Sequence, residues 1–277
     1  MGSSESKQER DEVIIEEDEE ELTDELRVQL TRLVAYAESA DVSLQQEVAE
    51  KLANEAVKPS RQKQIVDVGG LKLLLPLTQS VDMEVRRLAA HALANLSVNA
   101  ENQVTMAEEG GIEMLVDLLQ SEGNNAEAVH RQASKALANL GVNAVNKEKV
   151  RETGGIPPLI HLAKSDNISV SVEAIAALAN LAVNDTNEVE IARLGGLDPI
   201  LEGAGSSHHD LQSQSARALR NLSVHHENKT AIIKLNGVQI LRELVNDTGD
   251  DRIRLQASRA LSNLQTEMDE EELYSHK

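Results

Sequence analysis

One phrase of thirteen residues recurs along this chain and limits the possible folds more than any other feature. It reads HALANLSVNAENQ at residues 91–103, and variants of it follow at 135–147, 176–188 and 217–229. The Asn at the centre of the phrase occurs six times, at intervals of 41 to 44 residues: Asn54, Asn95, Asn139, Asn180, Asn221 and Asn263. A period of about 40 to 47 residues is typical of all-helical solenoids, in which each repeat packs only against its neighbours.

A second marker keeps the same period. A Gly pair, or Asn-Gly in its place, ends 16 residues after each of the first five central Asn residues, at Gly70, Gly111, Gly155, Gly196 and Gly237. The residue two before each Asn is always Leu, the residue six before is small or Val, and the residue ten before is aliphatic. Offsets of four residues trace one stripe of a helix, so these positions are predicted to face the core. The central Asn lies off that stripe.

Each repeat is predicted to contain three helices. We expect Asn102, Asn146, Asn187 and Asn228 to be the N-caps of short first helices, which the Gly pair ends in a left-handed conformation. A second helix follows, and Pro157 and Pro158 lie in its first turn in one repeat. A polar turn leads to the long third helix that carries the central Asn. Repeat three has three extra residues in this turn, near 122–125.

Charge divides the chain into a body and two acidic ends. The net charge is −20, of which −8 lies in residues 1–22 and −4 in residues 267–277. We expect residues 1–22 to be a disordered tail and residues 267–277 to be a tail or a helical cap. The strongly acidic balance and an aromatic content of 1% argue against nucleic acid as a partner.

The repeat resembles the armadillo family. The stretch NKEKVRETGGIPPLIHLAKSDNISVSVEAIAALANLAVN, residues 146–184, has the Gly-Gly break and the Asn-bearing third helix of an armadillo repeat. The resemblance covers residues 23–266 and implies an all-α, right-handed solenoid of about six repeats. Their approximate bounds are 23–58, 59–101, 102–145, 146–186, 187–227 and 228–266. The first repeat is expected to begin with a second helix capped by Thr23 or Asp24.

The resemblance implies a binding groove along the third helices. In this family the Asn side chains bind the main chain of an extended peptide, and an amide offers both a donor and an acceptor for that purpose. Repeats about 10 Å apart would meet an extended chain, which rises about 3.3 Å per residue, at every third residue. The alternative is that the six Asn side chains bind carbonyl groups of the solenoid and hold the repeats together. We favour the peptide-binding interpretation.

Charged residues beside the Asn row predict an acidic partner. Importin-like members carry Trp four residues before the Asn, whereas this chain has no Trp, and its column reads Glu50, His91, Lys135, Ala176, Arg217 and Arg259. Arg87 and Arg131 lie eight residues before the Asn. This pattern resembles the catenin branch, whose grooves take acidic segments. Arg and Lys pair strongly with carboxylates. One candidate ligand is the acidic and apolar segment 11–22 of the chain itself, although a solubilising tail is the simpler interpretation.

No catalytic, metal or cofactor site is predicted. The chain has no Cys, the pairs His208-His209 and His225-His226 are too far apart for one metal site, and the Gly-rich segment 203–207 lacks the Lys of a phosphate-binding loop. We expect a non-enzymatic scaffold or adaptor in the cytoplasm, with the nucleus or the membrane periphery as alternatives.

Three other interpretations stay open. The start MGSSES fits a myristoylation signal at Gly2, which would make the protein a membrane-anchored adaptor, although a start introduced by cloning fits equally. The chain could also be the armadillo part of a larger motor or ligase. A nuclear-transport receptor is disfavoured by the missing Trp.

Overall fold

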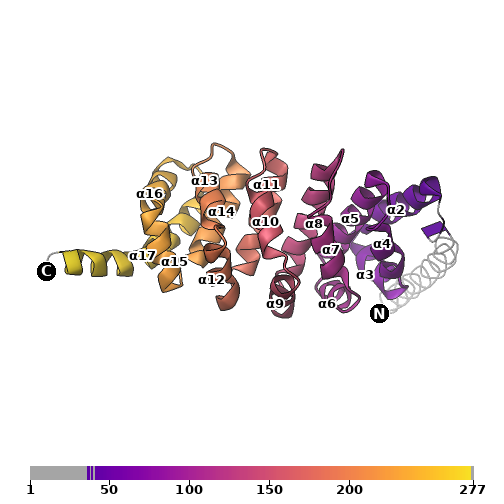
Figure 1. The fold of residues 1–277 in the computed structure, drawn as a ribbon, viewed down its shortest axis with the longest axis horizontal. Helices are drawn as coiled ribbons and strands as arrows, with labels where there is room; N and C mark the ends of the chain where they lie inside the picture. The colour runs from indigo at the N-terminus through magenta and orange to yellow at the C-terminus, as the bar shows by residue number, and fades with distance from the viewer. Residues whose placement is uncertain (1–35, 38, 40, 276–277) are drawn as a thin grey trace, which may run out of the picture.

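The computed structural model describes residues 36–37, 39 and 41–275, with side chains described as far as Gln265. Every secondary-structure element in this part of the chain is a helix. The helices form one elongated row in chain order, from α2 at one end to α17 at the other (Figure 1). Gly2, the segment 11–22 and the helix expected after Thr23 or Asp24 lie outside the described residues.

The helices repeat in threes, as the sequence predicts. The first helices are α3 (Pro59–Asp67), α6 (Ala100–Glu108), α9 (Ala144–Glu152), α12 (Asp185–Arg193) and α15 (His226–Lys234). The second helices are α4 (Leu71–Leu77), α7 (Gly111–Leu118), α10 (Ile156–Ala163), α13 (Leu197–Ala204) and α16 (Gly237–Asp247). The third helices are α2 (Val42–Ala56), α5 (Met83–Leu96), α8 (Ala126–Leu140), α11 (Ile168–Leu181), α14 (His209–Leu222) and α17 (Asp251–Ser275).

The core runs continuously through the stacked repeats. Each third helix packs directly against the third helices before and after it. The Leu two residues before the central Asn is buried in five repeats, at Leu52, Leu93, Leu137, Leu178 and Leu219. In the last repeat Leu261 is only half-buried. The small residues six positions before the Asn, such as Ala133 and Ala174, are fully buried and allow neighbouring third helices to approach closely.

The left-handed break after each first helix is confirmed. Gly69, Gly110, Gly154 and Gly195 have φ between 77° and 88°, and Asn236 takes the same place in the last repeat with φ 62°. The residue that follows each of them has negative φ and is Gly for a different reason. A Cβ atom on Gly111 would lie 2.7 Å from the carbonyl oxygen of Met106, a backbone atom that cannot move away freely.

These two neighbouring glycines are expected to respond differently to substitution. Gly110→Asn should change the free energy of unfolding by less than about 1 kcal/mol, because Asn tolerates the left-handed region and the space around Gly110 is open. Gly111→Ala should cost about 1 to 3 kcal/mol, because its methyl group forces the backbone apart. Thermal unfolding of both variants compares the two costs. Equal losses would show that steric closeness at Gly111 has no special weight.

The predicted N-caps are wrong by one turn. The first helices are capped three residues earlier, by Asn99, Asn143 and Asn184, whose side chains accept hydrogen bonds from the backbone N–H groups two and three residues ahead. His225 caps the corresponding helix of the last repeat through its Nδ1 atom. The four residues predicted as N-caps are instead buried inside their helices: Asn102, Asn146, Asn187 and Asn228.

The last helix is longer than the other third helices. α17 continues without a break to Ser275, so the predicted boundary at residue 267 falls inside a helix. None of the helices within the described residues is long and apolar enough to cross a membrane.

Candidate peptide-binding groove

The central Asn residues bind the preceding repeat. The Nδ2 atom of Asn180 donates to the carbonyl oxygen of Ala138 at 2.6 Å, and that of Asn221 donates to Ala179 at 2.8 Å. Asn139 donates to Ala94 and to the hydroxyl of Ser97, both at 3.1 Å. Asn263 repeats this arrangement with Arg220 and Ser223. In these four repeats the amide nitrogen therefore holds neighbouring repeats together, as the alternative interpretation of the Asn row predicts.

This arrangement leaves the amide oxygen of three of these residues for a ligand. The Oδ1 atoms of Asn139, Asn180 and Asn221 accept no hydrogen bond from any described residue, and none of them is enclosed. The bond from Nδ2 fixes the orientation of the side chain, so these oxygens form a row of acceptors at one level of the third helices. A peptide N–H is the matching donor. The predicted ladder can offer acceptors in these repeats, whereas its amide nitrogens are already engaged.

The first two Asn residues of the row differ from the others. Asn54 is exposed on α2. The Nδ2 atom of Asn95 is buried and has no hydrogen-bond partner, although the equivalent atoms of Asn139 and Asn180 bind the preceding repeat. A buried donor without a partner is uncommon and costs about 1 to 3 kcal/mol. The row therefore becomes regular only from repeat three onward.

A second row of Asn side chains ties the first helices together. Asn102, Asn146, Asn187 and Asn228 each donate through Nδ2 to a backbone carbonyl 40 to 43 residues earlier, at 2.9 to 3.1 Å. All four are at most 2% exposed, so they lie in the interface between repeats and cannot reach a ligand. The period of the sequence identifies these four residues, but the N-cap role predicted for them is a local one.

Four of the predicted basic residues gather on α5 and α8. Burial lowers the pKa of His91, and the positive charges of Arg87, Lys135 and Arg131 lower it further, because all three lie close to the imidazole. Arg87 is already paired, since it donates to both carboxylate oxygens of Glu84 at 2.8 and 2.6 Å. Arg131 makes no hydrogen bond or ion pair with any described residue and is exposed. We call these four residues the basic cluster.

The other two predicted basic residues lie further along the solenoid. Arg217 is mostly buried on α14, where its Nη2 atom donates to the carbonyl oxygen of Ala176 at 3.1 Å and burial lowers its pKa. Its Nε atom is buried without a partner. Arg259 is exposed on α17. The predicted basic column is therefore divided, with a compact cluster in repeats two and three and separate cations in repeats five and six.

An acidic residue that the sequence analysis missed separates the two parts. Glu173 on α11 lies beside the basic cluster, where burial raises the pKa of its carboxyl and Lys135 and Arg131 partly offset this effect. It lies seven residues before Asn180, a position that holds Gln132 and Gln214 in the repeats on either side. The residues seven positions before each central Asn contain this signal, since Glu173 stands between two Gln residues. Periodicity alone does not show that its carboxylate faces the neighbouring cations.

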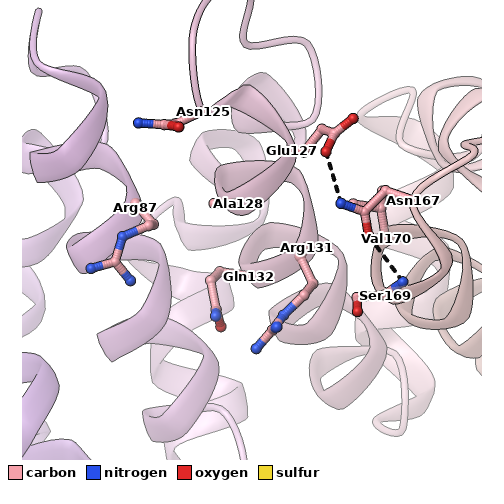
Figure 2. Close-up of a pocket in the computed structure, with 9 residues that line it drawn as sticks. All are labelled: Arg87, Asn125, Glu127, Ala128, Arg131, Gln132, Asn167, Ser169 and Val170. Atoms are coloured by element: carbon pink, nitrogen blue, oxygen red, sulfur yellow. Dashed lines mark hydrogen bonds between the residues drawn. The ribbon is translucent and has the colours of Figure 1, made fainter.

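Two cavities lie where the third helices begin. The first, of about 350 Å³, lies between α5, α8 and α11 and is lined by Arg87, Arg131, Gln132 and Asn167, among others (Figure 2). The second, of about 270 Å³, lies one repeat further along and shares Arg131 with the first. Glu173, His208 and His209 also line the second cavity. The two cavities are neighbours, because Arg131 and Ser169 line both of them.

A sequence model of the armadillo/beta-catenin-like repeat matches four segments, residues 59–98, 99–142, 143–183 and 225–264, which make up more than half of the chain. The chain belongs to the armadillo repeat family. This confirms the all-helical repeat fold predicted from the sequence. No curated protein sequence matches this chain significantly.

Solved structures of engineered and designed proteins have the same fold. An engineered protein from a structural genomics consortium is 34% identical, with a TM-score of 0.79 over 85% of this chain and 96% of that chain. A second engineered protein from this consortium is 31% identical, with a TM-score of 0.78 over 85% of this chain and 98% of its own. A designed armadillo repeat protein in complex with the peptide (KR)4 is 24% identical, with a TM-score of 0.75 over 84% of this chain and 98% of its own.

This armadillo chain also carries a row of exposed Val residues. Each lies three residues after a central Asn and is 57 to 61% exposed: Val57, Val98, Val142, Val183 and Val224. Each directly precedes the N-cap residue of a first helix. An apolar residue before an N-cap commonly packs against an apolar residue at the fourth helical position. That position is polar in all five helices, so this contact does not account for the row: Gln62, Gln103, Lys147, Glu188 and Lys229.

The two His pairs lie at helix starts. His208 and His225 are the N-cap residues of α14 and α15, as expected for histidines in turns. His209 lies 2.9 Å from a carboxylate oxygen of Asp250 in the next repeat. Within the described part of the chain, no group of three His, Cys, Asp or Glu side chains could hold a metal ion.

Proposed function

We propose that this armadillo protein is a non-enzymatic scaffold that binds an extended, acidic segment of a partner protein along its third helices. The row of Asn oxygens accepts hydrogen bonds from the main chain of the segment, and the cations beside the row select its side chains. The cytoplasm is the expected site of action. The fold supports a peptide-binding scaffold, because it exposes one long surface made of the same helix in every repeat.

The basic cluster carries the preference for an acidic partner. Arg87, Arg131 and Lys135 lie close to His91, whose lowered pKa leaves the imidazole uncharged at neutral pH, although the chain as a whole has a net charge of −20. A local group of cations on an acidic protein attracts anionic segments and repels cationic ones. The designed relative that binds (KR)4 has a basic ligand, so the direction of this preference is specific to the residues of the present chain.

The direct test compares two fluorescent peptides of opposite charge, (ED)4 and (KR)4, by anisotropy titration against the purified chain at several salt concentrations. We expect (ED)4 to bind more tightly than (KR)4 and to lose affinity as ionic strength rises, because exposed ion pairs are screened. Tighter binding of (KR)4, or (ED)4 binding that ignores salt, would contradict the acidic preference.

Charge reversal in the groove is expected to abolish most of this binding. Lys135→Glu combined with Arg259→Glu should weaken (ED)4 binding at least about tenfold at low salt, because two attractive charges become repulsive. Both positions lie on third helices in the column four residues before the Asn. The matched control is Lys72→Glu with Arg242→Glu, two exposed residues on the second helices α4 and α16.

The control pair changes the net charge by the same amount and should weaken binding less than about threefold, since only long-range repulsion is added. Equal losses in the two double variants would assign the effect to net charge and not to the third-helix surface. Anchoring through Gly2 and membership of a larger motor or ligase stay separate proposals, and the absence of Trp disfavours a nuclear-transport role.

A further inference from the structure

We infer that the cavity between α5, α8 and α11 is a specificity pocket for one carboxylate side chain, Asp or Glu, of the bound segment. This inference depends on the proposed function, because the side chain must arrive on an extended peptide. The cavity has a volume of about 350 Å³, enough to admit a side chain of this size. Figure 2 shows the residues that line it.

Arg131 supplies the charge for the carboxylate. Its guanidinium makes no ion pair or hydrogen bond with any described residue, whereas Arg87 on the other side of the cavity is already held by Glu84. Glu127 also lines the cavity, but its carboxylate accepts a hydrogen bond from Nδ2 of Asn167 at 2.7 Å and points away from Arg131 in Figure 2. A planar guanidinium can bind a carboxylate through two parallel hydrogen bonds.

Gln132 lines the cavity, and its amide oxygen has no hydrogen-bond partner within the described residues. This side chain is only 7% exposed, and its Oε1 atom is buried without a hydrogen-bond partner. Leaving a buried amide oxygen unpaired is unfavourable, and a ligand that supplies a donor removes the cost. In the view of Figure 2 the amide of Gln132 lies between the side chains of Arg87 and Arg131. A peptide N–H next to the bound carboxylate is the donor that this position fits.

The pocket belongs to one place in the solenoid. One wall is formed by Asn125, which comes from the turn that carries three extra residues in repeat three and adopts φ 66°. The next cavity along the row contains Glu173 and Asp210 besides Arg131. The pocket for the carboxylate is therefore followed, one repeat or about three peptide residues further, by a recess of mixed charge. This difference between the two recesses sets which residue of the bound segment occupies which recess.

The first experiment measures (ED)4 affinity for two variants that remove one exposed Arg each. Arg131→Gln should weaken binding about fivefold to tenfold, the effect of losing a hydrogen-bonded ion pair. Arg242→Gln removes the same charge from α16 and should leave the affinity within about twofold, because an isolated surface charge is screened. Gln132→Met, which keeps the size of the side chain, should also weaken binding, and melting curves of all variants establish that they are folded.

The second experiment locates the bound peptide. The chain has no Cys, so a single introduced thiol reacts alone. An (ED)4 peptide with one central Cys, activated as a mixed disulfide, should label Ser169→Cys at the edge of the cavity faster than Ser60→Cys on α3. If the wild type binds (ED)4 but both Arg variants and both Cys variants behave alike, the pocket is overturned while the proposed function stands. If the wild type does not bind (ED)4, both fall.

Discussion

Replacing Glu188 by Gln is expected to stabilise the protein above neutral pH. The Glu188 side chain is only 5% exposed, in the first helix α12, and burial together with the charge of Asp185 raises the pKa of its carboxyl to about 7. The equivalent residues in the two preceding repeats are donors: Gln103 donates to the carbonyl oxygen of Ser97 and Lys147 to that of Val142. An ionised carboxylate cannot donate, and the hydrogen bond that it accepts from the backbone N–H of His225 offsets only part of the cost of burial, so Glu188 is the unfavourable member of the column.

The pH dependence follows from the direction of this shift. A carboxyl whose pKa is raised by folding contributes stability below its unfolded pKa, near 4.5, and this contribution is lost as pH rises through about 7. Glu188→Gln does not titrate, so the free energy of unfolding of the variant should exceed that of the wild type by up to about 3 kcal/mol at pH 8.5 and by much less at pH 5.5.

Chemical denaturation at both pH values measures this difference. Glu202→Gln is the matched control, because it removes the same charge from an exposed position of α13 and should change stability by less than about 0.5 kcal/mol at either pH. A difference between wild type and Glu188→Gln that is the same at pH 5.5 and pH 8.5 would mean that the carboxyl titrates normally.

Asn187→Asp is expected to be among the most damaging conservative substitutions in the chain. Asn187 is fully buried, and its Nδ2 atom donates to the carbonyl oxygens of Lys147 at 3.0 Å and Leu181 at 3.3 Å. Asp has the same shape but replaces the donor with an oxygen and adds a buried negative charge facing two carbonyl oxygens. The expected loss at pH 7 is about 3 to 5 kcal/mol, as for other unpaired buried charges.

The same helix provides the control. Asn184→Asp makes the same chemical change three residues earlier, where the side chain only accepts hydrogen bonds from the N–H groups of Thr186 and Asn187. Asp is as good an N-cap as Asn and favours the positive end of the helix, so stability should change by less than about 1 kcal/mol. Similar melting temperatures for the two variants would argue against a special role of Asn187 between the repeats.

Much of the fold could be predicted from sequence because equivalent positions in several repeats share the same structural environment. The burial of Leu178 and Ala174 and the left-handed break at Gly195 follow from positions shared by several repeats. The N-cap was harder to place. Asn99 and Asn102 lie three residues apart in one turn, and both have the propensity to cap a helix. Only the neighbouring repeat, with the carbonyl oxygen of Gln62 in reach, decides that Asn102 is the buried one.

The candidate groove was predicted less completely. The row of central Asn residues and the cations beside it were identified by spacing, and the structure brings Arg87, His91, Arg131 and Lys135 together. Their availability could not be predicted. Arg87 is held by Glu84 while Arg131 is not, and Gln132 has an unpaired oxygen because no donor from a neighbouring helix reaches it. Such differences depend on side-chain geometry within a shared pattern.

The sequence by itself determined the period, the three-helix unit and the face of each helix that enters the core. It could do so because every repeat of a solenoid meets nearly the same surroundings, and one chain therefore contains several versions of each position. Only the tertiary structure decided where the polar atoms go. Asn180 donates to the backbone carbonyl of Ala138 and Asn187 to that of Lys147, 40 to 42 residues away. Every residue has a backbone carbonyl, so such a partner cannot be identified from the sequence.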